Sequence, residues 1–175
     1  MLLRVPLTGY YSPMEPDVET KRAMALDFLK SHTAGVLATI SREGEPHASV
    51  VYYTSDESFS IFFLTLISSR KYAAMKANPK AAFVVGTLDV PQTLQIEGTV
   101  TELHEGEDMG KHIPELLQRL TSNATYFAPI TKMDPADIVV MWLEAKWIRW
   151  GDYATAGSGN KNVFTEFDPK QSFLD

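Results

Sequence analysis

The segment Thr65-Leu-Ile-Ser-Ser-Arg-Lys71 places hydroxyl side chains and two adjacent cations where an aromatic strand is expected to become a helix. Residues 59–64, which precede it, are aromatic and β-branched, as is typical of a buried strand. Residues 72–76, which follow it, favour a helix, and Asn78-Pro79 is expected to end that helix. The segment therefore predicts a turn from strand to helix.

The two cations of this turn occupy an electrostatically unfavourable position. If Ser68 or Ser69 is the N-cap, Arg70 and Lys71 fall in the first helical turn, where the helix dipole costs about 0.3–1 kcal/mol per cation. A bound anion removes this conflict, because free backbone N–H groups, a serine hydroxyl, a guanidinium and an ammonium converge on it. The alternative is a solvated basic pair beside an ordinary capping serine, and these residues alone leave both interpretations open.

The composition is that of a globular protein with one domain. The chain has 175 residues, 45% of them hydrophobic and 22% charged, and a net charge of −6. An acidic chain is a poor partner for nucleic acid or an anionic membrane, so a local basic pair favours a small anionic ligand. The absence of cysteine excludes disulfides, thiolate metal sites and cysteine nucleophiles. We find no secretion signal and no apolar run long enough to span a membrane, and we expect a cytoplasmic protein.

Short aromatic or alternating segments predict six or seven strands. They lie at residues 35–40, 47–54, 59–64, 81–87, 94–103, 138–143 and 146–150. Longer helices are expected at residues 17–32 and 105–121, the second interrupted or started by Pro114. Strands at short spacing with few helices predict a mainly β protein built as an antiparallel barrel. Residues 1–16 are expected to form an N-terminal arm, residues 17–153 the barrel domain, and residues 154–175 a loosely structured C-terminal tail.

Other candidate motifs carry less information. The four histidines share no short metal-ligand spacing, and we expect no metal site. The stretch Gly157-Ser-Gly-Asn-Lys161 lacks the later glycine or the Lys-Ser/Thr pair of nucleotide-binding loops, which favours a flexible turn.

The chain resembles the pyridoxamine 5′-phosphate oxidase-like, FMN-binding split β-barrel proteins. The most specific part is residues 62–82, in which Ser69-Arg70-Lys71 follows Thr65 after four residues and Asn78-Pro79 precedes the next strand. The strand at residues 47–52 and the later Ile96-Glu-Gly98 also fit. The resemblance covers residues 20–103 well and the C-terminal part loosely, and it implies a split antiparallel β-barrel.

The resemblance also implies an FMN site and a homodimer. In such proteins the Ser-Arg-Lys side chains hold the FMN phosphate, which implies that role for Ser69, Arg70 and Lys71, with help from Thr65. The resemblance further implies that FMN lies at the dimer interface.

The isoalloxazine ring has its own implied contacts. These are the backbone groups of the second strand, here Ser49, Val50 and Val51, and a late-strand tryptophan of the partner chain, for which Trp150 is the candidate.

The chain departs from the true oxidase at its substrate residues. That enzyme has an Arg at the start of the second-strand motif and a Lys at its end, where this chain has Ala48 and Tyr53. The Arg-Gln before a later strand appears here as Gln92-Thr93, and the Arg-Leu-His-Asp-Arg segment has no counterpart. We therefore expect an FMN-dependent oxidoreductase with another, unidentified substrate, and we assign no catalytic residue. The alternatives are a non-catalytic flavin-binding or sensing protein, and a split barrel that uses a deazaflavin or haem.

Overall fold

A computed structural model describes residues 15–86, 91–104, 107–121, 132–154 and 162–170, and the structural statements below concern these residues. Of the predicted N-terminal arm (residues 1–16), only residues 15 and 16 belong to this described part of the chain, and the Gly157–Lys161 stretch lies outside it. Within this part of the chain, the helices are too short or too polar to cross a membrane.

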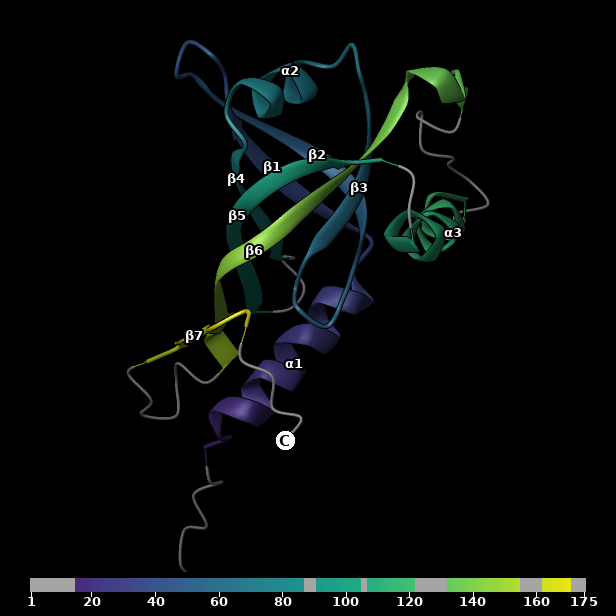
Figure 1. The fold of residues 1–175 in the computed structure, drawn as a ribbon. Coiled ribbons are helices and arrows are strands. Elements are labelled where there is room, and N and C mark those ends of the chain that lie inside the picture. The colour runs from purple at the N-terminus through teal and green to yellow at the C-terminus, as the bar shows by residue number, and fades with distance from the viewer. Residues whose placement is uncertain (1–14, 87–90, 105–106, 122–131, 155–161, 171–175) are drawn as a thin grey trace, which may run out of the picture.

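Six antiparallel strands close into a barrel, which confirms the mainly β fold predicted from the sequence (Figure 1). The strands are β1 (Ala34–Ile40), β2 (Pro46–Ser55), β3 (Ile61–Leu66), β4 (Lys80–Gly86), β5 (Gln92–Leu103) and β6 (Ile138–Asp152). Their order is β3-β2-β1-β4-β5-β6, and β6 returns to pair with β3. The last residue of β3, Leu66, pairs with the first residue of β6, Ile138, just before the chain enters helix α2 (Arg70–Ala77).

The barrel interior is filled by alternate side chains of all six strands. Tyr53, Phe63 and Phe83 are among the side chains that are fully buried there. Helix α1 (Val18–Ser31) closes one end of the barrel and adds Phe28 and Leu29 to the same core (Figure 1). The Tyr53 hydroxyl donates to the Leu29 carbonyl at 2.6 Å, which ties β2 to this helix.

Strand β6 is continuous from residue 138 to residue 152, so the prediction of two separate strands was wrong. The reason is a bulge: Glu97 pairs with Trp147 and Gly98 with Ala145, which leaves Lys146 as an extra residue. A Cβ on Gly98 would lie 2.0 Å from the Glu144 carbonyl oxygen, so glycine is required at this crossing.

The expected loose tail also contains regular structure. Strand β7 (Phe164–Phe167) pairs with the second half of β6, and Phe167 is buried in the main core. The prediction that residues 154–175 are loosely structured was therefore wrong for residues 164–167.

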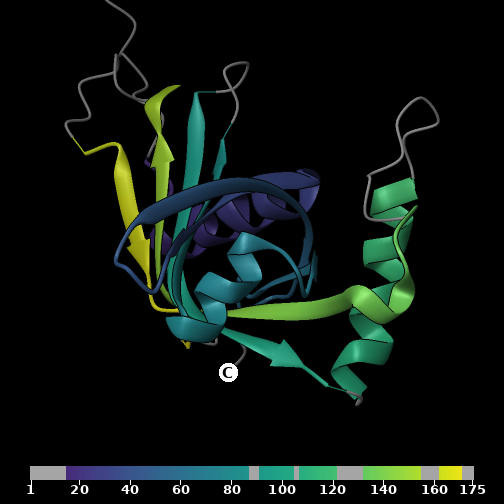
Figure 2. The same cartoon turned by 90° about the horizontal axis from the view of Figure 1, so that it is seen from above.

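Helix α3 (Glu107–Thr121) lies beside the barrel, next to the start of β6 (Figure 2). The helix continues through Pro114, so the prediction that this proline interrupts or starts the helix was wrong. An interior proline costs about 3 kcal/mol. Here the buried stripe of His112, Leu116 and Leu120 holds the helix against β2 and β3. The Arg119 guanidinium donates to the carbonyls of Lys30 and His32 at 3.2 and 2.9 Å, which fastens α3 to the end of α1.

Candidate functional site

Helix α2 (Arg70–Ala77) begins where the sequence predicted, with Ser69 as its N-cap. The Ser69 hydroxyl accepts from the Tyr72 N–H at 3.2 Å and lies 3.0 Å from the buried Thr65 hydroxyl. The helix ends before Asn78-Pro79, as expected. The fold thus brings together the two hydroxyls whose four-residue spacing marked this segment.

The first turn of α2 carries two cations and no acidic residue. Among the described residues, no carboxylate lies within ion-pair distance of Arg70 or Lys71. Lys71 is half-buried, and this burial lowers the pKa of its ammonium group. Two unpaired cations at the positive end of a helix dipole form a site that an anion would stabilise.

Sequence reasoning missed a third group at this site, His47 at the start of β2. The Arg70 Nη2 atom lies 3.1 Å from His47 Nε2 and 3.3 Å from Nδ1. No motif marks His47, because only the closure of β2 against the α2 turn places it there.

The first half of β2 has one open backbone edge. Residues 46–52 pair with β1, whereas β3 pairs only with residues 53–55. Along this edge Ser49 is half-buried, the Val50 side chain is 69% exposed and the Val51 side chain is buried. Unpaired strand groups can form hydrogen bonds to a planar ligand, and the backbone contacts of these three residues with a flavin ring stay a prediction.

Trp150 does not join the other predicted site residues. Its side chain is 2% exposed in the core of its own chain, with its ring centroid 5.0 Å from that of Phe28. In this conformation it cannot touch a cofactor held by a partner chain.

The outer face of β2, β1 and β4 is apolar and exposed. Val36 pairs with Val50 on one side and with Val84 on the other, and their exposed fractions are 40, 69 and 39%. A row of small residues runs beside them: Ala48, Ala38 and Ala82. We call these six residues the Val–Ala face. Such a contiguous apolar patch is typical of an interaction surface.

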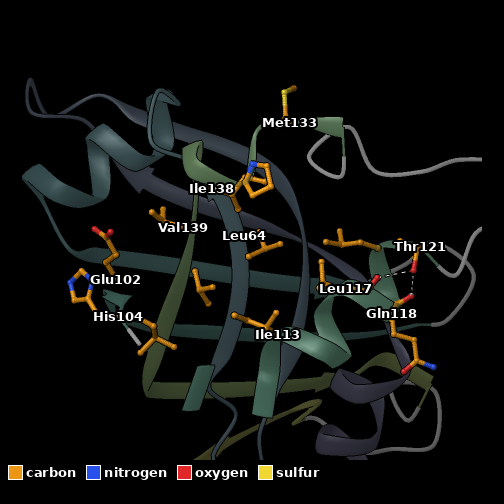
Figure 3. Close-up of a pocket in the computed structure, with 14 residues that line it drawn as sticks. Leu64, Glu102, His104, Ile113, Leu117, Gln118, Thr121, Met133, Ile138 and Val139 are labelled. Carbon is orange, nitrogen blue, oxygen red and sulfur yellow. Dashed lines mark hydrogen bonds between the residues drawn. The ribbon is translucent and has the colours of Figure 1, made fainter. Parts of the chain in front are cut away.

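A cavity of about 850 Å³ lies between α3 and the outer side of β3, β5 and β6 (Figure 3). Leu64, Ile113 and Leu117 are among its mainly apolar lining residues. Figure 3 shows Glu102 and His104 together at one end, and Gln118 and Thr121 at the other. No linear motif marks this cavity, since its walls come from four distant segments.

Glu102 links the cavity to α2. Its carboxylate accepts from the Tyr72 hydroxyl at 2.9 Å and from the Lys76 ammonium at 3.3 Å. Partial burial alone would raise the pKa of Glu102, but the hydrogen bonds and the positive charge of Lys76 outweigh it and lower the pKa. The carboxylate is therefore ionised and already engaged.

Residues 22–150 match the family model of pyridoxamine 5′-phosphate oxidase. Among curated relatives, a pyridoxine/pyridoxamine 5′-phosphate oxidase of Alkalilimnicola ehrlichii is 34% identical over 91 residues, which is 52% of this chain and 46% of that protein. The corresponding protein of Cupriavidus metallidurans is 29% identical over 79 residues, or 45% of this chain and 37% of that protein. The matched segment thus spans less than half the length of these relatives.

Solved structures share the fold. A heme-binding protein from Mycobacterium smegmatis has a TM-score of 0.66 and 18% identity, and the match covers 90% of this chain and 60% of that one. A protein from Clostridium acetobutylicum related to general stress protein 26 has a TM-score of 0.62 and 16% identity, covering 86% of this chain and 95% of that one. At these identities the similarity establishes the fold alone.

Proposed function

Because the chain belongs to the pyridoxamine 5′-phosphate oxidase family, we propose that it is an FMN-dependent oxidoreductase whose FMN phosphate binds at the start of α2. One observation carries the proposal: Lys71 is half-buried beside Arg70 in the first turn of a helix, and neither has a carboxylate partner among the described residues. A charged phosphate offsets both the dipole conflict and the burial of the ammonium.

The residues present fit the phosphate of FMN. Arg70 supplies a guanidinium, Lys71 an ammonium, and the α2 N-terminus backbone N–H groups. The Ser69 hydroxyl is kept at this end of the helix by Thr65. When bound, the flavin supplies hydride or electron transfer, and the protein supplies anchoring, orientation and shielding.

The isoalloxazine ring is proposed to lie along the open edge of β2, against the backbone of Ser49, Val50 and Val51. Val50 belongs both to this edge and to the exposed Val–Ala face. We therefore propose that two chains associate through this face as a homodimer, which places FMN at the interface. Trp150 is not part of this proposal, because its side chain is buried in its own core.

Pyridoxamine phosphate is not the proposed substrate. Tyr53, which stands where the oxidase has a lysine, is buried and donates its hydroxyl to Leu29. Ala48, which stands where the oxidase has an arginine, carries no charge. Neither of these two positions of β2 therefore carries a cation that could bind the phosphate of a pyridoxamine phosphate substrate.

The test is an FMN titration of the full chain, followed by flavin fluorescence, with an absorption spectrum of the loaded protein. We expect stoichiometric FMN in the wild type and at least a 100-fold weaker affinity after the double change Arg70→Ala and Lys71→Ala. The control is Lys76→Ala, at the other end of the same helix, which should keep wild-type affinity.

Two results would overturn the assignment. One is a double variant that still binds FMN stoichiometrically. The other is a wild-type protein that ignores FMN but acquires a Soret band with haem, which would favour the haem alternative. Oxidation of NADH or NADPH by the FMN-loaded protein separates an oxidoreductase from a flavin-binding protein without turnover.

A further inference from the structure

The cavity under α3 has walls suited to a small molecule. Its volume of about 850 Å³ falls within the range of about 300–1,000 Å³ that ligand pockets occupy. Leu64 and Ile138 form its wall on the sheet side, and Ile113 and Leu117 its wall on the helix side. An occupant would be surrounded mainly by aliphatic side chains.

The described lining of the cavity contains neither lysine nor arginine. Of the residues that line it in the described part of the chain, only Glu102 and His104 are ionisable, and both lie at one end (Figure 3). Glu102 is negative and already accepts hydrogen bonds from Tyr72 and Lys76. A phosphate or carboxylate placed among the aliphatic walls would lose its hydration without compensation.

The cavity adjoins the proposed phosphate anchor. Leu64 lines it from the outer face of β3, and the next residue, Thr65, lies on the inner face of the same strand, where it contacts the Ser69 cap. On the facing strand, Val139 lines the cavity and pairs with Thr65. Through Glu102 and Tyr72 the cavity is also joined to α2.

We propose that this cavity binds an uncharged, largely apolar small molecule, and that this class of compound is the substrate presented to the flavin. The second half of the proposal rests on the proposed function, whereas the first half does not. The molecule has its polar group at one end, where Glu102 accepts and His104 accepts or donates a hydrogen bond. The remainder of the molecule lies against the aliphatic side chains between this end and the Gln118–Thr121 end.

Two fluorescent probes that differ by one charged group test the first half on FMN-free protein. N-phenylnaphthylamine is neutral, and anilinonaphthalene sulfonate carries the same rings with an added anion. We expect the neutral probe to bind with at least tenfold higher affinity than the sulfonate. Equal affinities, a preference for the sulfonate, or no binding of the neutral probe would overturn the proposal.

The variant Leu117→Arg locates the binding. Leu117 is partly exposed on α3, so the protein tolerates the change, and the added cation should reverse the preference in favour of the sulfonate. Met24→Arg is the matched control, since Met24 is a partly exposed apolar residue on another helix, α1. If Leu117→Arg leaves both affinities unchanged, the probe binds elsewhere and the cavity assignment fails.

The link to the flavin is tested separately. The double change Arg70→Ala and Lys71→Ala should abolish FMN binding and leave the neutral probe bound, so failure of the phosphate anchor is distinguishable from failure of the cavity. In FMN-loaded wild type, the neutral probe should shift the visible flavin bands. If the probe binds and the bands do not move, the cavity does not adjoin the flavin and the substrate assignment is wrong.

Discussion

Replacing Lys71 by methionine should stabilise the FMN-free protein and weaken FMN binding. The side chain is half-buried, its ammonium has lost part of its hydration, and it lies in the first turn of α2. Methionine keeps the apolar stem and removes the charge. A residue retained for ligand binding at the expense of stability should show these two effects together.

The magnitudes follow from the position of the charge. Removing a cation from a helix N-terminus gains about 0.3–1 kcal/mol. For a domain of this size, that gain raises the Tm by about 1–4 °C. The lost charge-assisted hydrogen bond to phosphate is worth about 1.5–3 kcal/mol, so the Kd for FMN should rise by about 10- to 150-fold.

Thermal unfolding followed by circular dichroism and an FMN titration measure the two effects. Lys76→Met is the control: Lys76 lies in the last turn of the same helix and pairs with Glu102 at 3.3 Å. Its loss should lower stability by about 0.2–1 kcal/mol and leave the FMN affinity unchanged. If Lys71→Met lowers the Tm of FMN-free protein, or changes the Kd less than twofold, the reasoning about this site is refuted.

Three further predictions concern the fold, the interface and pH. Arg119→Ala removes the hydrogen bonds that fasten α3 to the end of α1, so denaturant unfolding should show a loss of about 2–3 kcal/mol; a loss below about 0.5 kcal/mol would contradict this role. Val36→Lys places a charge at the centre of the Val–Ala face, and light scattering should show a dimer becoming a monomer, whereas the control Met24→Lys should leave the dimer intact. Burial lowers the pKa of Lys71, so its ammonium loses its proton at a lower pH than an ordinary lysine does. The FMN affinity of the wild type should therefore fall as the pH rises into the alkaline range below the ordinary lysine pKa. An equally steep fall in the Lys71→Met variant would refute the assignment.

The strand-to-helix turn was predictable because its signals are local. A hydroxyl at the cap, helix formers after it and Asn78-Pro79 at the end each act within a few residues, and the structure places Ser69 as the cap accordingly. The burial of Lys71 and the approach of His47 to Arg70 were not predictable, because both depend on how distant strands close the barrel.

The end of the barrel shows why the remaining strands were harder to predict. The inward-facing residues of β6 are two apart up to Ala145, but the next inward-facing residue, Ile148, follows after three. In the sequence, this interruption of the alternating pattern suggests two separate strands. In the structure, it is caused by the bulge at Lys146 within one strand. The short β7 has no long alternating pattern, and it is specified by pairing with β6 and by the burial of Phe167.

The most direct measurement of the central claim is a parallel titration of the wild-type protein with FMN and with riboflavin, which has the same ring without the phosphate. If Ser69, Arg70 and Lys71 anchor the phosphate, FMN should bind at least 100-fold more tightly than riboflavin, and the double change Arg70→Ala and Lys71→Ala should remove that difference. Equal affinity of the wild type for the two flavins would contradict the account.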